Sequence, residues 1–257
     1  MHVLYEDNHL LVIDKPPGYV TMGGRPGEPS VHAWARDYLK HKYGKPGNAY
    51  VGIVSRLDSE VSGVLVLART SKAAGRLSEQ IRQRQVTKRY LALVDGDTSR
   101  LVCGRWIVLR NFLRKNESLR RMEVVGQRAD GAVEAILRVC PIAYTSMGTM
   151  VEIDLITGRK HQIRVQLANY GMPIRGDPKY GRGGQRAGRS SMRLHCCRVT
   201  IRHPTRKTRQ TFRSWPTSWW PELPRTLWKS IEQRMASDGD DEPPLPPPGD
   251  PRRRSKG

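Results

Sequence analysis

The fold is decided by residues 51–68, which read VGIVSRLDSEVSGVLVLA. An apolar run leads to Arg56 and Asp58, a polar turn follows, and a second apolar run predicts a buried strand. If residues 54–58 are extended, side chains alternate between the two faces of the chain, and Arg56 and Asp58 point the same way. A cation and a carboxylate side by side at the lip of a buried strand indicate a site that holds an anionic polymer and carries out chemistry on it.

The charge of the chain points to the same kind of partner. Its 257 residues contain 45 Lys and Arg against 24 Asp and Glu, which gives a formal net charge of +21. The tail from Ser237 holds five acids and four bases, so the positive charge belongs to the residues before it. A body charged in this way attracts phosphate chains or acidic membranes. Basicity that serves only solubility is disfavoured, because so large an excess also raises self-repulsion.

Several classes of protein are disfavoured by what the chain lacks. No stretch approaches the ~20 apolar residues of a membrane span. The N-terminus resembles neither a signal peptide nor a transit peptide, so we expect a cytoplasmic protein without a membrane partner. The glycines form no P-loop or dinucleotide fingerprint. The cysteines have no zinc-ligand spacing and are expected to be buried thiols or to lie on strands; they are Cys103, Cys140, Cys196 and Cys197.

Alternation, turn residues and caps predict a mixture of strands and helices. Strands are expected at residues 9–14, 87–94, 151–156, 192–202 and 208–215. Helices are expected from the Ser30 cap to Gly44 and over residues 71–81, 161–170 and 223–235. No element is assigned between residues 100 and 150, and residues 176–188 read as a mobile loop. Because the elements have no regular βαβ rhythm, they predict an α+β fold. We expect one folded domain over residues 1–235 and a disordered, Pro- and charge-rich tail over 236–257.

Four candidate residues each have an ordinary structural explanation beside a functional one. Asp58 fits either a catalytic carboxylate or a turn residue. Lys160 and Arg164 share one face of the predicted helix, which suits an anion or a paired carboxylate but also a solvated basic face. Tyr90 opens an apolar strand, where its ring either packs in the core or stacks on a nucleic-acid base.

Taken in order, six motifs make the chain resemble the RluA-type pseudouridine synthases. DKPxG is matched by Asp14-Lys15-Pro16-Pro17-Gly18, and RLDxxTSG by Arg56-Leu57-Asp58 with Ser62-Gly63. KxYxAxV is matched by Lys88, Tyr90, Ala92 and Val94, and TGRxHQIRxH by Thr157-Gly158-Arg159 and His161-Gln162-Ile163-Arg164. HPIxGDxxYG and LHAxxxxxxHP are close to residues 172–181 and 194–204. The chain departs from the pattern at Ser55 and Gln166, where relatives have His, and at Val61, where Thr is usual.

The resemblance implies the pseudouridine-synthase catalytic fold, an α+β fold with a mixed, largely antiparallel sheet flanked by helices and loops and an active-site cleft across the sheet. It implies one catalytic domain over residues 1–235, without a separate N-terminal RNA-binding domain. The implied activity is isomerisation of uridine to pseudouridine in structured RNA, either rRNA or tRNA. Product and substrate contain the same atoms, so no cofactor and no metal are expected. The expected partner is RNA, bound by a monomer.

Residue roles also follow from the resemblance. Asp58 is the implied catalytic aspartate, acting as a nucleophile at C1′ or as a base at C2′, and Arg164 is the cation that offsets its desolvation. Tyr90 stacks on the detached uracil and assists loss of its C5 proton. Arg56 enters the RNA stack as the target base leaves it, at a cost of a few kcal/mol. The expected substrate-binding residues are Arg56, Lys15, Arg159, Lys160, His161 and Gln162.

Two other classes of function are weighed against this one. A non-catalytic RNA-binding or ribosome-assembly protein on the same fold need not keep Asp58, Tyr90 and Arg164, and all three are present. A basic DNA-binding module is disfavoured because the chain has no clear helix-turn-helix or zinc finger.

Overall fold

The computed structural model describes residues 1–24, 27–44, 46–99, 101–181, 192–224, 227–229 and 231–233. The chain divides into two compact units, Met1–Pro221 and Glu222–Gly257. Most of the predicted loop at 176–188 and the whole predicted tail at 236–257 lie outside the described residues. In the second unit, residues 227–229 and 231–233 are helical, in agreement with part of the helix predicted at 223–235.

A mixed sheet organises the described part of the first unit. Its eleven strands follow the order β1-β2-β4-β10-β5-β9-β8-β6-β7, with β3 paired to β4 and β11 to β10. The strands are β1 His2–Glu6, β2 Leu10–Lys15, β3 Gly52–Ile53, β4 Ser62–Ala68, β5 Thr87–Val94, β6 Ile107–Asn116, β7 Arg121–Val125, β8 Val133–Thr145, β9 Gly148–Leu155, β10 Leu194–Arg202 and β11 Arg209–Arg213. Among these strands β4 and β10 run parallel and every other pair is antiparallel. The predicted α+β class and largely antiparallel sheet are confirmed.

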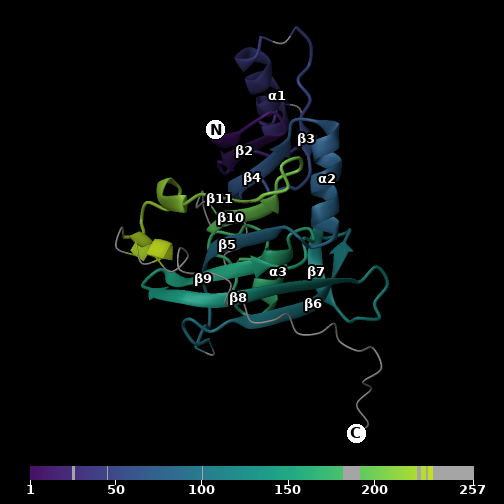
Figure 1. The fold of residues 1–257 in the computed structure, drawn as a ribbon. Coiled ribbons are helices and arrows are strands. Elements are labelled where there is room, and N and C mark those ends of the chain that lie inside the picture. Colours follow the sequence, from purple (N-terminus) through teal and green to yellow (C-terminus); the bar gives the residue numbers. More distant parts are fainter. Residues whose placement is uncertain are drawn as a thin grey trace. The chain divides into compact units, whose positions relative to one another are not determined.

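The first two helices begin at hydroxyl caps, the first of them at the predicted residue. In α1, Val31–Lys42, the Ser30 side chain accepts the Ala33 N–H at 3.2 Å. In α2, Ser71–Arg82, the cap is Thr70 and not the predicted Ser71. Thr70 has the extended backbone of an N-cap, and its hydroxyl accepts the Ala73 N–H at 3.1 Å. The third helix, α3 Gln162–Asn169, packs against β6 and β7, whereas α2 packs against β3, β4 and β10 (Figure 1).

The core lies around the central strands, which are buried on both faces. All seven residues of β4 are buried, as are Leu10–Ile13 of β2, which therefore read as continuous apolar runs and not as alternating ones. Ala73 and Leu77 of α2 join this core. Along the described residues, no helix combines the length and apolarity needed to cross a membrane.

Three parts of the sequence reading differ from the structure. Residues 100–150, left unassigned, form β6, β7 and β8. Residues 54–58 are not an extended strand, because β3 ends at Ile53 and an irregular loop leads into β4. Three of the four cysteines are buried on strands, but Cys103 is exposed because it lies in a surface turn before β6.

Candidate active site

The loop that carries Asp58 is held by hydrogen bonds from two buried side chains. Lys15 has no exposed surface, and its ammonium donates to the carbonyls of Pro16, Tyr19 and Ser59 at 2.8, 2.8 and 2.9 Å. The Thr21 hydroxyl accepts the Leu57 N–H at 3.1 Å and donates to the Leu57 carbonyl at 2.8 Å. The residues on both sides of Asp58 are therefore hydrogen-bonded to the interior, which limits how far the carboxylate can move.

Arg164 joins Asp58 to a second carboxylate. Its Nη1 donates to Asp58 Oδ2 at 2.8 Å, while Nε and Nη2 form a two-point contact with Asp177 at 2.7 and 2.9 Å. The Asp58 side chain keeps 31% of its surface exposed, whereas that of Asp177 has none. Asp177 thus anchors the guanidinium in the interior, and Asp58 faces outward from it.

Charge pairing outweighs desolvation at Asp177 and Arg164. Burial would raise the pKa of Asp177, but the hydrogen bonds and charge of Arg164 and the N–H groups of Lys179 and Tyr180 lower it below its usual value. Burial would likewise lower the pKa of Arg164, and its two carboxylate partners raise it above the ordinary value for arginine. Asp177 and Arg164 therefore stay ionised, and the guanidinium is a permanent cation against Asp58.

His161 lies near the Asp58 carboxylate, and Tyr180 contacts the other side of its ring. His161 Nε2 lies 3.8 Å from Asp58 Oδ2, and its Nδ1 lies 2.9 Å from the Tyr180 hydroxyl. That hydroxyl accepts the Met122 N–H at 2.9 Å, so its own proton is available to Nδ1, which favours the tautomer with Nε2–H facing Asp58. Burial lowers the pKa of His161 to about 4, with Asp58 opposing that shift, so the ring is neutral near pH 7.

Tyr90 lies on β5 beside these groups. It is level with Cys196 of β10 and Ile153 of β9, and only 5% of its surface is exposed. Burial raises the pKa of Tyr90 well above its usual value, with further contributions from Cys196 and Asp58. The phenol therefore keeps its proton.

The other predicted binding residues divide between the surface and the interior. Arg56, Arg159 and Lys160 are exposed, and the Arg159 Nε donates to the Glu134 carbonyl at 3.0 Å. Gln162 is buried: it accepts from the Thr157 hydroxyl and the Arg159 N–H and donates to the Ile136 carbonyl. Lys15 and Gln162 thus lie in the scaffold of the site and not at its surface.

Asp177 and Tyr180 complete the arrangement but were not predicted as site residues. Both fall in residues 172–181, the stretch that is close to the family motif HPIxGDxxYG and to which no site role was assigned. The sequence did contain one indication of them: Arg164 was expected on a helix that packs against the core. Such a buried cation requires carboxylate and hydrogen-bond partners, and the nearest unassigned acid after the helix is Asp177.

Comparison with known proteins points to one family. The family model described as RNA pseudouridylate synthase matches residues 9–169. Ribosomal large subunit pseudouridine synthase D of Xylella fastidiosa is 36% identical over 221 residues, covering 80% of this chain and 63% of the relative. Dual-specificity RNA pseudouridine synthase RluA of Haemophilus influenzae is 29% identical, covering 82% of this chain and 91% of the relative. The chain spans 50% to 63% of the length of several D-type relatives.

The fold is shared with a solved structure. Human RNA Pseudouridylate Synthase Domain Containing 4 superposes with a TM-score of 0.69 at 23% identity, covering 91% of this chain and 93% of that one. The matched family region includes Asp58, Tyr90 and Arg164 and extends over more than half of the chain. The chain belongs to the RNA pseudouridylate synthase family.

Proposed function

We propose that this protein is an RNA pseudouridine synthase that isomerises uridine in the RNA of the large ribosomal subunit, with Asp58 as the catalytic carboxylate. The observation that carries the proposal is the 2.8 Å contact between Arg164 and an Asp58 side chain that remains 31% exposed. Relatives named as ribosomal large subunit synthases support rRNA as the substrate, and tRNA is the second RNA to test. We propose a monomer that acts on RNA in the cytoplasm.

The two oxygens of Asp58 have different surroundings, which suits the proposed chemistry. Arg164 and His161 both approach Oδ2, and the described residues place no hydrogen-bond donor on Oδ1. Oδ1 is therefore the oxygen that faces the nucleoside. If Oδ1 attacks C1′, the N1–C1′ bond breaks as the ester to Asp58 forms, and C5 of the turned uracil then displaces the carboxylate from C1′. If Oδ1 instead removes the C2′ proton, a C1′–C2′ double bond forms as N1 leaves, and the proton returns to C2′ when C5 bonds to C1′. The C5 proton is lost and N1 gains one, so no atom is added overall.

Tyr90 is assigned to stacking against the uracil while it is detached. A buried ring at the edge of the site offers a flat apolar surface, and such stacking is worth about 1–3 kcal/mol per base. Because its raised pKa keeps the phenol protonated, we do not assign the removal of the C5 proton to Tyr90.

The exposed candidate residues are assigned to binding the RNA, and the buried ones to supporting the active-site loops. Arg56 lies two residues before Asp58 and is exposed, so it can occupy the space that the extruded base leaves. Arg159 and Lys160 contact phosphates at the start of α3. Lys15 and Gln162 position the Asp58 loop and the start of α3, which accounts for their burial.

The test is the Asp58→Asn variant, which keeps the size of the side chain and removes its charge. Pseudouridines are mapped in total RNA from cells that lack the gene and are supplied with wild type, Asp58→Asn or the exposed control Asp130→Asn. We expect at least one rRNA site to be lost with Asp58→Asn and kept with the control. Unchanged maps would contradict the proposal and favour a non-catalytic RNA-binding role.

A further inference from the structure

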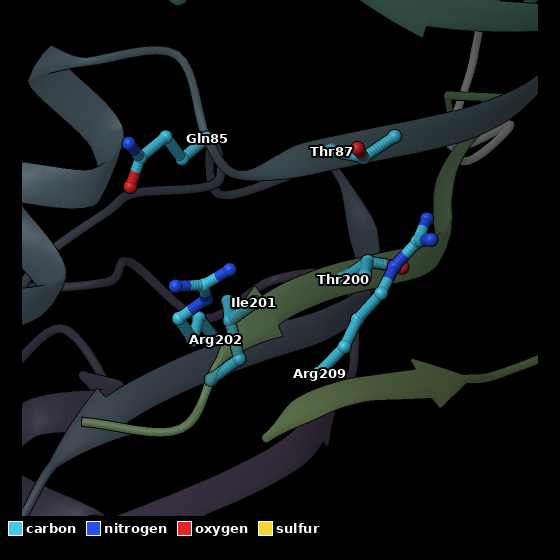
Figure 2. Close-up of a pocket in the computed structure, with 6 residues that line it drawn as sticks. All are labelled: Gln85, Thr87, Thr200, Ile201, Arg202 and Arg209. Carbon is cyan, nitrogen blue, oxygen red and sulfur yellow. The ribbon is translucent and has the colours of Figure 1, made fainter. Parts of the chain in front are cut away.

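Lys88 shares one face of the sheet with Tyr90. It belongs to the same motif and lies two residues before Tyr90 on β5, so the two side chains leave the strand on the same side. Thr87 leaves on the opposite side, where it lines a separate cavity with Thr200 (Figure 2). Because Asp58 contributes to the raised pKa of Tyr90, the Tyr90 face is the one on which the active site lies.

The ammonium group of Lys88 has no hydrogen-bond or ion-pair partner in the described part of the chain. The side chain is nevertheless half-buried, and burial lowers the pKa of Lys88. By contrast, the buried ammonium of Lys15 donates to three carbonyl oxygens. Holding a charge away from water without an acceptor costs stability. The Lys88 ammonium is therefore available to an anion that arrives with the substrate.

Lys88 and Tyr90 both lie beside the Cys196 thiol of β10. Tyr90 is level with Cys196 and hydrogen-bonded to it, and Cys196 also interacts electrostatically with Lys88. Burial raises the pKa of Cys196 to about 12, so the thiol is neutral near pH 7. It does not compensate the ammonium, but it shows that the charge and the aromatic ring adjoin the same position on β10.

The proposed reaction moves one negative charge from Asp58 to the uracil. When the N1–C1′ bond breaks, N1 keeps the electron pair and the detached uracil is an anion. By either route Asp58 loses its charge in the same step, because it forms an ester or accepts the C2′ proton. Arg164 stabilises the charge while it is on Asp58. A cation beside Tyr90 would stabilise it on the uracil, and would interact only weakly with the neutral base of bound uridine, so it would lower the barrier.

We propose that Lys88 is a further catalytic residue, whose ammonium group stabilises the negative charge on the uracil while the base is detached, an inference that rests on the proposed function. When C5 bonds to C1′, the charge returns to Asp58, either by displacement of the ester or by return of the proton to C2′. Lys88 therefore forms no covalent bond and keeps its proton throughout.

The first test removes the charge of Lys88 and measures the chemical step. Lys88→Met keeps a linear apolar side chain, Lys88→Arg keeps the charge, and Lys72→Met is the control at an exposed lysine of α2. Single-turnover rates are measured on an rRNA fragment that carries the site lost in the Asp58→Asn map. We expect Lys88→Met to slow N1–C1′ cleavage about 100-fold, as loss of a donor to a developing anion does, with RNA affinity near that of wild type. Lys88→Arg should recover part of the rate, and Lys72→Met should keep all of it.

5-Fluorouridine at the target site separates this role from a structural one. Fluorine withdraws electrons and makes the uracil anion more stable by itself, so cleavage depends less on a cation. The rate loss caused by Lys88→Met should therefore be smaller with 5-fluorouridine than with uridine. Equal losses would mean that Lys88 only supports the fold. A wild-type rate for Lys88→Met, or a loss of RNA affinity alone, would also overturn the inference.

A second test measures binding of the free base 5-fluorouracil and needs no RNA target. In the Asp58→Asn variant, position 58 is neutral, as it is once the charge has moved to the uracil. Binding is followed by fluorine NMR at a pH where half of the free base is ionised. We expect Lys88→Met in this background to weaken binding at least about tenfold, because a charged hydrogen bond is lost, and Lys72→Met to leave it unchanged.

The two tests distinguish this inference from the proposed function. If the Asp58→Asn map loses an rRNA site but neither the cleavage rate nor base binding depends on Lys88, the inference alone fails. If the map is unchanged but base binding depends on Lys88, the assigned chemistry fails and the anion site stands. Base binding that does not depend on Lys88 overturns the inference whatever the map shows.

Discussion

At the scale of single residues, one guanidinium balances the charges of the site. The Nε and Nη2 atoms of Arg164 donate to the fully buried Asp177, and its Nη1 donates to Asp58. The family resemblance implied that Arg164 is the cation beside Asp58, and the structure places the two groups 2.8 Å apart. Asp177 was not predicted: its position as the first acid after the helix made it a candidate partner, but only the folded chain brings its carboxylate back to Arg164, 13 residues earlier in the sequence.

The Asp177→Asn variant should affect turnover more than substrate binding. Without the second carboxylate, Arg164 is free to shift, and misplacing a catalytic group by about 1 Å can reduce the rate up to roughly 100-fold. Loss of one member of a buried ion pair should also reduce the free energy of unfolding by about 3 kcal/mol. We expect kcat to fall with KM little changed, measured on rRNA at a temperature where the variant is folded. Asp177→Glu should restore part of kcat; a loss confined to KM would argue against this positioning role.

The contacts of a single residue, Gln166, explain one departure from the family pattern. Gln166, which stands where relatives have His, is fully buried in α3. Its amide nitrogen donates to the carbonyls of Leu109 and Ala135 and to the Asn111 side chain, at 3.1, 3.2 and 2.8 Å. The residue therefore fastens α3 to β6 and β8, so the departure concerns the support of Arg164 and not the reacting groups.

At the scale of elements, the parallel pairing of β4 and β10 sets the distance between the Asp58 loop and the strand beside Tyr90. Gly63 of β4 pairs with Cys196, which in turn pairs with Tyr90. Gly63 has a φ of +114°, and a Cβ there would lie 2.2 Å from the Cys196 carbonyl oxygen. Only glycine permits this approach.

The Gly63→Ala variant should therefore be strongly destabilised. Both the strained backbone and the collision with Cys196 oppose a methyl group, so we expect the free energy of unfolding to fall by at least about 2 kcal/mol. Denaturant titration measures it. Gly75→Ala is a matched control, because Gly75 lies inside α2 with open space around it, and alanine there should add about 0.5–1 kcal/mol. Equal effects at the two positions would show that the strands can separate without cost.

Elements with local signals were predicted well and elements with distant partners were not. The strand at 87–94 has the predicted bounds, and α1 begins at the predicted cap. The 13-residue strand β8 was missed because it contains Pro141 and a buried arginine. A bulge next to Pro141 accommodates the ring, and Arg138 is paired with Asp154 on the neighbouring strand β9. Neither compensation is visible in the local sequence.

At the scale of the whole molecule, the excess of positive charge and the buried histidines both lower the stability of the fold at acidic pH. The chain carries a formal charge of +21 near neutral pH, and protonation of carboxylates increases its self-repulsion as the pH falls. His195 is fully buried, and burial lowers its pKa to about 3. Its Nδ1 lies 2.8 Å from the Ser62 hydroxyl, which holds the ring between β4 and β10.

The free energy of unfolding should therefore decrease as the pH is lowered from about 6.5 toward 3. In that range the unfolded chain binds a proton at His195, whose ordinary pKa is 6.5, and the folded chain does not. A one-proton difference contributes about 1.4 kcal/mol per pH unit, and His161 adds to it down to about pH 4. His195→Asn should make the pH dependence shallower by up to one proton. Repeating the titration at high salt screens the self-repulsion but not the histidine contribution, so a pH dependence abolished by salt in wild type would assign the acid sensitivity to net charge alone.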